Sequence, residues 1–213
     1  MQPRVLLVAT NLAVPWLAPV VKSLVRDCAA IAVVTTAEPK LKERARNAML
    51  AHEALRAAGV GRVEYFDLDF PAGGTLASFD GVCLASGNPF YLLERIRETA
   101  QDLALEDLLA AGRPVLACGA ATLLLGRTLA HMREFDPSIS DLGGVNPTAL
   151  GVLPLSLLPQ ANRWRARWGD YAARLERRRK IGGEIVELDD DAAMVFERGE
   201  RLDLSANFVE VPG

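Results

Sequence analysis

Histidine and cysteine are scarce in this sequence, which limits the chemistry that it can carry. The 213 residues include two histidines, His52 and His131, and three cysteines, Cys28, Cys83 and Cys118. An odd number of cysteines without the paired spacing of metal ligands argues against a disulfide scaffold and favours a reducing compartment, so we expect a cytoplasmic protein. We expect no metal and no cofactor.

Long apolar runs and a large net charge are also lacking. The apolar N-terminal stretch is interrupted by Asn11, Pro15 and Pro19, which predicts a first strand and helix and not a signal peptide or a membrane span. The net charge of -3 at pH 7 gives no general attraction to nucleic acid or to an anionic membrane. Half of the residues are hydrophobic and 24% are charged, as in soluble globular proteins. Arginine outnumbers lysine, a slight indication of a bacterial genome rich in GC.

Short apolar segments alternate with segments of helical periodicity along the first half of the chain. The predicted strands are residues 5–10, 30–36, 62–68, 82–85 and 115–117, and the predicted helices are residues 16–25, 38–58, 90–100 and 104–111. This alternation predicts a three-layer α/β fold with a mainly parallel, flavodoxin-like sheet. We find no internal repeat and no linker, so we expect residues 1–213 to form a single domain.

The second half of the chain has a different pattern. Residues 135–149 have a loop-forming composition, and residues 151–158 predict an irregular or edge strand because Pro154 lies inside them. Residues 164–180 predict an arginine-rich helix. The short segments 184–187, 193–197 and 202–204 predict a small C-terminal antiparallel meander.

Residues 113–126, which read R-P-V-L-A-C-G-A-A-T-L-L-L-G, predict a strand, a sharp turn and a helix. This is the form of a nucleophile elbow, in which the nucleophile stands at the tip of a strained turn between small residues. The tip falls at Gly119, which relieves the strain but supplies no attacking atom. Cys118 is a substitute nucleophile only if the register shifts by one residue. Because adjacent strand side chains point to opposite faces, we favour a packing role for Cys118.

Two segments together resemble the peptidase E family, the dipeptidase E and cyanophycinase group of serine hydrolases. These segments are F-D-G-V-C-L-A-S-G-N-P-F-Y-L-L at residues 79–93 and R-P-V-L-A-C-G-A-A-T at residues 113–122. Residues 153–160 match the spacing of a third family segment, Leu-Pro-x-x-x-x-Pro-His, and residues 187–195 are similar to a tail motif of the family. The resemblance implies a fold similar to the class I glutamine amidotransferase domain.

The same resemblance implies that the catalytic pair is missing. The family's serine falls on Gly119 and its histidine on Gln160, while its acidic residue would correspond to Glu134 or Asp136. We therefore expect a non-catalytic homologue, a pseudoenzyme that binds a small peptide or an acidic small molecule.

The binding half of the site has candidates of its own. The resemblance places the two backbone N–H donors of the oxyanion hole at Gly87 and Ala120, and such donors do not depend on side-chain identity. Asn88 and Gln160 carry amides that can hydrogen-bond a ligand or satisfy the loop backbone. We expect these four residues to bind the ligand.

Two other functions stay open. The first is an active peptidase or amidase that uses Cys118 or Ser86 as nucleophile with His131 or a carboxylate, although we favour a turn-forming role for Ser86 and a surface or helix-end position for His131. His52 is expected on the solvated face of its helix.

The second alternative is a protein or polyanion interaction module built on the arginine-rich helix. Against it, Trp164, Trp168 and Tyr171 are spaced i, i+4, i+7, which predicts a stripe that faces the core. Nucleic acid is therefore not the partner that we expect, and a homodimer stays open.

Overall fold

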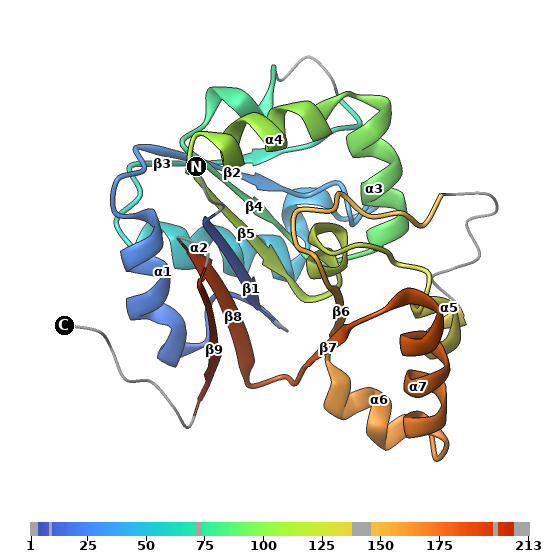
Figure 1. Ribbon diagram of the computed structural model, residues 1–213. Helices are drawn as coiled ribbons and strands as arrows, with labels where there is room; N and C mark the ends of the chain where they lie inside the picture. The colour runs from blue at the N-terminus through green and yellow to red at the C-terminus, as the bar shows by residue number, and fades with distance from the viewer. Residues whose placement is uncertain (1–3, 9, 71–73, 138–145, 198–199, 207–213) are drawn as a thin grey trace.

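The computed structural model describes residues 4–8, 10–70, 74–137, 146–197 and 200–206. Its main sheet has seven strands in the order β3-β2-β4-β5-β1-β8-β9 (Figure 1). Five strands are parallel, namely β1 (Arg4–Val8), β2 (Ala30–Val34), β3 (Arg62–Phe66), β4 (Gly81–Leu84) and β5 (Pro114–Cys118). The antiparallel hairpin of β8 (Ala192–Glu197) and β9 (Glu200–Ser205) extends the sheet beside β1. The predicted mainly parallel fold is confirmed.

Helices cover both faces of this sheet and create two cores (Figure 1). One face packs against α1 (Ala18–Val25) and α2 (Arg46–Ala57), and the other packs against α3 (Pro89–Glu98) and α4 (Gln101–Ala110). Alternation along the strands divides the side chains: Leu6 and Leu116 belong to the first core, and Leu7 and Val115 belong to the second. The three predicted layers follow from this division.

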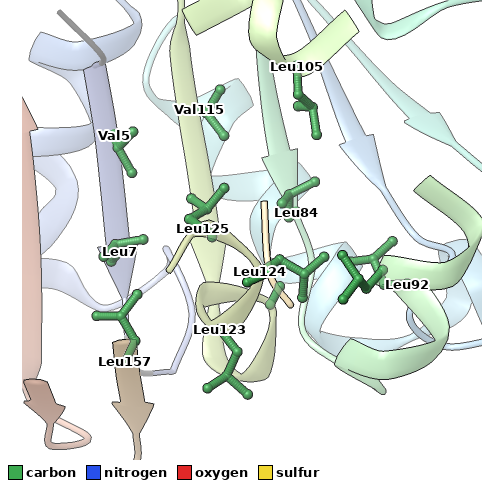
Figure 2. Close-up of a cluster of buried hydrophobic side chains, with 14 of the residues drawn as sticks. Val5, Leu7, Leu84, Leu92, Leu105, Val115, Leu123, Leu124, Leu125 and Leu157 are labelled. Carbon is green, nitrogen blue, oxygen red and sulfur yellow. The ribbon is translucent and has the colours of Figure 1, made fainter. Parts of the chain in front are cut away.

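The elbow segment continues as a 3₁₀ helix, η5 (Gly119–Leu125), where an α-helix was predicted. Its leucines Leu123, Leu124 and Leu125 are fully buried, and Figure 2 shows them among side chains from β1, β4 and β5. The helix α5 (Met132–Phe135) follows. Burial of three consecutive leucines fixes the direction in which the chain leaves the turn.

Two predicted helices are divided in the structure. The segment 38–58 contains a short 3₁₀ helix, η2 (Lys42–Arg44), before α2 begins at Arg46, because Lys42 has a left-handed backbone (φ 51) that no α-helix accommodates. The arginine-rich segment forms α6 (Ala161–Arg167) and α7 (Tyr171–Gly182), with extended backbone at Trp168 between them. Two further 3₁₀ turns are η1 (Pro15–Leu17) and η4 (Leu76–Ser78).

The predicted C-terminal meander is only partly correct. β8 and β9 are antiparallel as expected, but β7 (Ile185–Leu188) pairs in parallel with β6 (Ser156–Pro159) in a separate two-stranded sheet. The helices α6 and α7 form the crossover that parallel pairing requires. This small unit lies beside the carboxyl ends of the main strands (Figure 1). Across the described part of the chain, no helix combines the length and apolar character needed to span a bilayer.

Candidate functional site

A pocket of about 770 Å³ lies at the carboxyl edge of the main sheet. Its walls come from the segments that follow β2, β4 and β5 and from the start of α6. The chain continues from β2 into α2 on one face and from β4 into α3 on the other, which makes this the switch point where ligands bind in open α/β sheets. The lining residues are Ala37, Glu38, Pro39, Lys40, Leu41, Asn47, Ser86, Gly87, Asn88, Ala120, Met132, Asp136, Pro159, Gln160 and Trp164.

The tip of the elbow has no room for a side chain. Gly119 has φ +52, and a Cβ placed on it would collide with Ser86 Oγ and lie 2.9 Å from Ser86 Cβ. Non-bonded carbon atoms are optimally separated by roughly 3.5 to 4.0 Å, so a serine at position 119 would require Ser86 to move. Ser86, which follows β4, therefore fills the space that a side chain at position 119 would need.

The two expected anion donors differ in availability. Ala120 N–H donates to Ser86 Oγ at 3.2 Å, so it already has an acceptor within the protein. Gly87 N–H has no acceptor among the described residues. Gly87 also packs so closely on Ala37 that a Cβ would collide with the Ala37 carbonyl. A single free backbone donor remains of the pair that the resemblance implies.

Asn88 and Gln160 both line the pocket, but they are held in different ways. Asn88 caps α3, since its Oδ1 accepts from Phe90 N–H at 3.0 Å and from Tyr91 N–H at 3.2 Å. Gln160 lies between β6 and α6 with a left-handed backbone (φ 59), and its side-chain amide has no partner among the described residues. Gln160 therefore contributes a free amide to the site.

The two candidate acids are separated by the structure. Asp136 lines the pocket. Glu134 instead pairs with Arg178 at 3.2 Å and with Arg177 at 3.7 Å, both on α7. If a carboxylate acts in the pocket from this segment, it is Asp136.

Cys118 is buried, as the alternation of strand side chains predicts. It is 0% exposed and belongs to the core under α1 and α2, together with Cys83. A hydrogen bond with Cys118, together with burial, raises the pKa of the Cys83 thiol well above its ordinary value. Neither thiol lines the pocket.

Neither histidine lines the pocket. His131 is the N-cap residue of α5, so the expected helix-end position is confirmed, but it is 2% exposed, so the alternative surface position is wrong. Its Nε2 contacts the Leu157 carbonyl at 2.7 Å, and burial lowers its pKa from 6.5 to about 4. His52 is half-buried and stacks on Tyr65 with ring centroids 4.8 Å apart, where a solvated position was expected. The pocket therefore contains no histidine base among its described lining residues.

Part of the site was not predicted from the sequence. Glu38, Lys40 and Asn47 line the pocket from the segment after β2, and Trp164 lines it from α6. The only sequence signal for the first group was its position after an apolar strand, which is where ligands bind in such sheets. Trp164 was assigned to a core stripe, and it serves both roles because it is only partly buried.

An ion-pair network fixes the segment between β2 and α2. Lys42 Nζ lies 2.9 Å from Asp67 Oδ1 and also pairs with Asp69. Asp69 accepts from the Tyr91 hydroxyl at 2.9 Å and pairs with Arg95 at 2.8 Å. The pocket wall at residues 37–41 is thereby tied to β3 and α3.

The basic side chains of α6 and α7 are largely matched by carboxylates. Examples are Arg163 with Asp190 at 2.7 Å and Arg165 with Glu187 at 2.9 Å. Arg167 lies over the rings of Trp164 and Trp168. The aromatic stripe faces the core, as predicted: Tyr171 is buried, and Trp164 and Trp168 pack against the same cluster.

The sheet lies between two layers of helices and has the elbow and the pocket at its carboxyl edge. This three-layer α/β fold is the class expected for a relative of peptidase E. Over 96% of its length the fold is similar to a peptidase E protein of Listeria monocytogenes (TM-score 0.72, 17% identity, 99% of that chain). It is similar over the same share to a peptidase from an acI-B1 actinobacterium (TM-score 0.71, 15% identity, 88% of that chain).

The model of peptidase family S51 matches residues 51–204, and the chain belongs to this family. The resemblance to peptidase E is thereby confirmed. An uncharacterised peptidase of Listeria monocytogenes is 25% identical over 83 residues, which are 39% of this chain and 40% of that relative. The matched region thus covers two-fifths of the curated relative's length.

Proposed function

We propose that this protein binds a small peptide or an acidic metabolite in the pocket without hydrolysing it. The observation that carries the proposal is the collision between Ser86 and any side chain at position 119. A nucleophile cannot be presented at the elbow while Ser86 keeps its place. The absence of histidine and cysteine from the described pocket lining supports the same conclusion.

The pocket supplies hydrogen-bond donors for a ligand with a carboxylate or an amide, and its lining also includes the two carboxylates of Glu38 and Asp136. Lys40, the Gln160 amide and the Gly87 N–H are donors without partners among the described residues. Met132 and Trp164 supply apolar surface beside them. A few polar groups on a largely apolar lining are typical of small-molecule sites.

The proposal is tested with purified protein and a series of aspartyl dipeptides. We expect calorimetry to detect binding and mass spectrometry to detect no cleavage. Gln160→Ala and Lys40→Ala should each weaken binding about tenfold, the equivalent of one hydrogen bond or ion pair. Lys180→Ala, which changes an exposed lysine on α7 that pairs with Glu176, is the matched control. Cleavage that disappears in a pocket variant would contradict the proposal.

A second candidate is a hydrolase that uses Ser86, because its hydroxyl lies in the elbow space and lines the pocket. A fluorophosphonate probe forms a covalent bond with an activated serine. Labelling of wild-type protein that is lost in Ser86→Ala would establish this candidate. We expect no labelling, since no histidine of the pocket lining activates the hydroxyl.

A further inference from the structure

Ser86 makes a contact that ligands of the elbow would otherwise make. It follows β4, is half-buried and lines the pocket. Its Oγ accepts the Ala120 N–H at 3.2 Å. A backbone N–H directed to one acceptor is not available to a second at the same distance and angle. The elbow N–H is therefore occupied before any ligand arrives.

The same serine also controls what position 119 can be. The collision at Gly119 involves Ser86 Oγ, but Ser86 Cβ would also be only 2.9 Å from a Cβ at 119. Rotation of the hydroxyl about χ1 removes the first contact and leaves the second, because Cβ does not move with χ1. Residues 86 and 119 therefore share a single space, which only one side chain can fill.

The hydroxyl of Ser86 keeps a hydrogen to donate. A serine that accepts one hydrogen bond still has its O–H donor, and no acceptor for it lies among the described residues. Together with the free Gly87 N–H, this gives two adjacent donors at the pocket. A carbonyl or carboxylate oxygen is the ligand group that suits such a pair.

We propose that the Ser86 hydroxyl occupies the place at the elbow where an anionic ligand group would bind to the Ala120 N–H, and that Ser86 thereby determines which ligand groups the pocket accepts. The Ala120 N–H is closed to ligands, and the ligand's oxygen is received by the Ser86 hydroxyl and the Gly87 N–H. This inference rests on the proposed function in that it concerns the same pocket. It assigns to Ser86 a role in specificity, and not in attack on the substrate.

The first test is amide hydrogen exchange and NMR of Ala120 in the full-length protein. The Ala120 N–H should be protected in the wild type and should exchange at least about fivefold faster in Ser86→Ala and Ser86→Gly, because its acceptor is removed. Inorganic phosphate should shift the Ala120 amide resonance further in Ser86→Gly, where this N–H is free to bind it, than in the wild type, where the N–H stays bonded to Ser86 Oγ. Ser78→Ala, which removes a hydroxyl that bonds the Thr75 carbonyl in an exposed 3₁₀ turn, is the control.

The second test is the coupling between positions 86 and 119. Gly119→Ala should lower the unfolding midpoint in the wild type and in Ser86→Gly, since φ +52 disfavours any side chain. The loss should be greater in the wild type, where the collision adds to the strain. Equal decreases of the unfolding midpoint in the wild type and in Ser86→Gly would show that residues 86 and 119 do not share a single space.

These outcomes separate the inference from the proposed function. A phosphate-induced shift of the Ala120 amide that is as large in the wild type as in Ser86→Gly, or unchanged exchange in Ser86→Ala, would show that Ser86 does not occupy the Ala120 N–H, even if dipeptides bind. A failure of dipeptides to bind would overturn the proposed function and leave the exchange result unaffected.

Discussion

Gly119 and Gln160 both have left-handed backbones, but the free-energy cost of this conformation differs between them. Gly119 adopts φ +52 without a steric penalty, whereas Gln160 adopts φ 59 with a full side chain. A left-handed residue other than glycine costs roughly 1–2 kcal/mol, so the surroundings must hold Gln160. They do so through its carbonyl, which accepts from Arg163 N–H at 2.9 Å and from Trp164 N–H at 3.3 Å. Gln160, on which the resemblance places the family's histidine, is thus held in the pocket wall.

His131 should make the protein acid-sensitive. Its pKa falls from 6.5 to about 4 because burial disfavours the imidazolium, so between these values the unfolded chain binds a proton that the folded chain does not. Stability should therefore fall as the pH falls through this window, by up to about 3 kcal/mol, and should change no further from this source below about pH 4.

Urea unfolding of the wild type and His131→Gln across that window measures the effect. The variant should have lost this part of the pH dependence, because glutamine does not titrate. The two curves should run parallel above pH 7. A variant that keeps the full slope would assign it to other groups.

At the scale of elements, the segment between β2 and α2 depends on one lysine. The Lys42 side chain is 15% exposed, and its partners Asp67 and Asp69 are 17% and 19% exposed. Removing one member of a partly buried ion network leaves its partners incompletely paired. Lys42→Met should therefore lower the free energy of unfolding by about 2 kcal/mol and increase hydrogen exchange at residues 37–45.

Lys40→Met is the matched control for this element. Lys40 lies in the same segment, is exposed, and has no side-chain partner among the described residues, so its replacement should change stability by less than about 0.5 kcal/mol. Equal effects of the two substitutions would mean that the network does not hold the segment.

The elements themselves were predicted unevenly. Four of the five parallel strands, β1, β2, β4 and β5, follow from apolar runs, because strands buried on both faces need few polar residues, whereas β3 is a mostly exposed edge strand. The helix breaks at Lys42 and Trp168 were not predicted, because each depends on contacts with distant segments. Lys42 pairs with Asp67 and Asp69, and the Trp168 indole N–H donates to the Phe135 carbonyl at 3.0 Å. The parallel pairing of β6 with β7 is likewise a tertiary result.

At the scale of the whole molecule, charge argues against a polyanion partner. The net charge is -3, and the arginines of α6 and α7 pair with carboxylates such as Glu187 and Asp190. We expect gel filtration with and without heparin, at low and high salt, to give the same elution volume. A shift at low salt that Arg177→Ala abolishes would support the interaction module instead; Arg177 is 55% exposed and pairs only at 3.7 Å.

The sequence by itself determined the family and the parallel sheet, and it predicts that the catalytic pair is replaced at Gly119 and Gln160. These results depend on local patterns: the apolar runs, the composition of the elbow, and the residues Gly119 and Gln160 within segments that resemble the family. It also predicted that Cys118 would be buried, because strand alternation is a local rule.

Only the tertiary structure shows that Ser86 fills the space beside Gly119 at the elbow. The contact between Ser86 and the elbow joins residues 34 positions apart, at the ends of neighbouring strands. The tertiary structure also places Asp136 in the pocket and Glu134 outside it, and it buries His131 against the Leu157 carbonyl. Distances between side chains on different strands depend on register and packing, which no local pattern encodes.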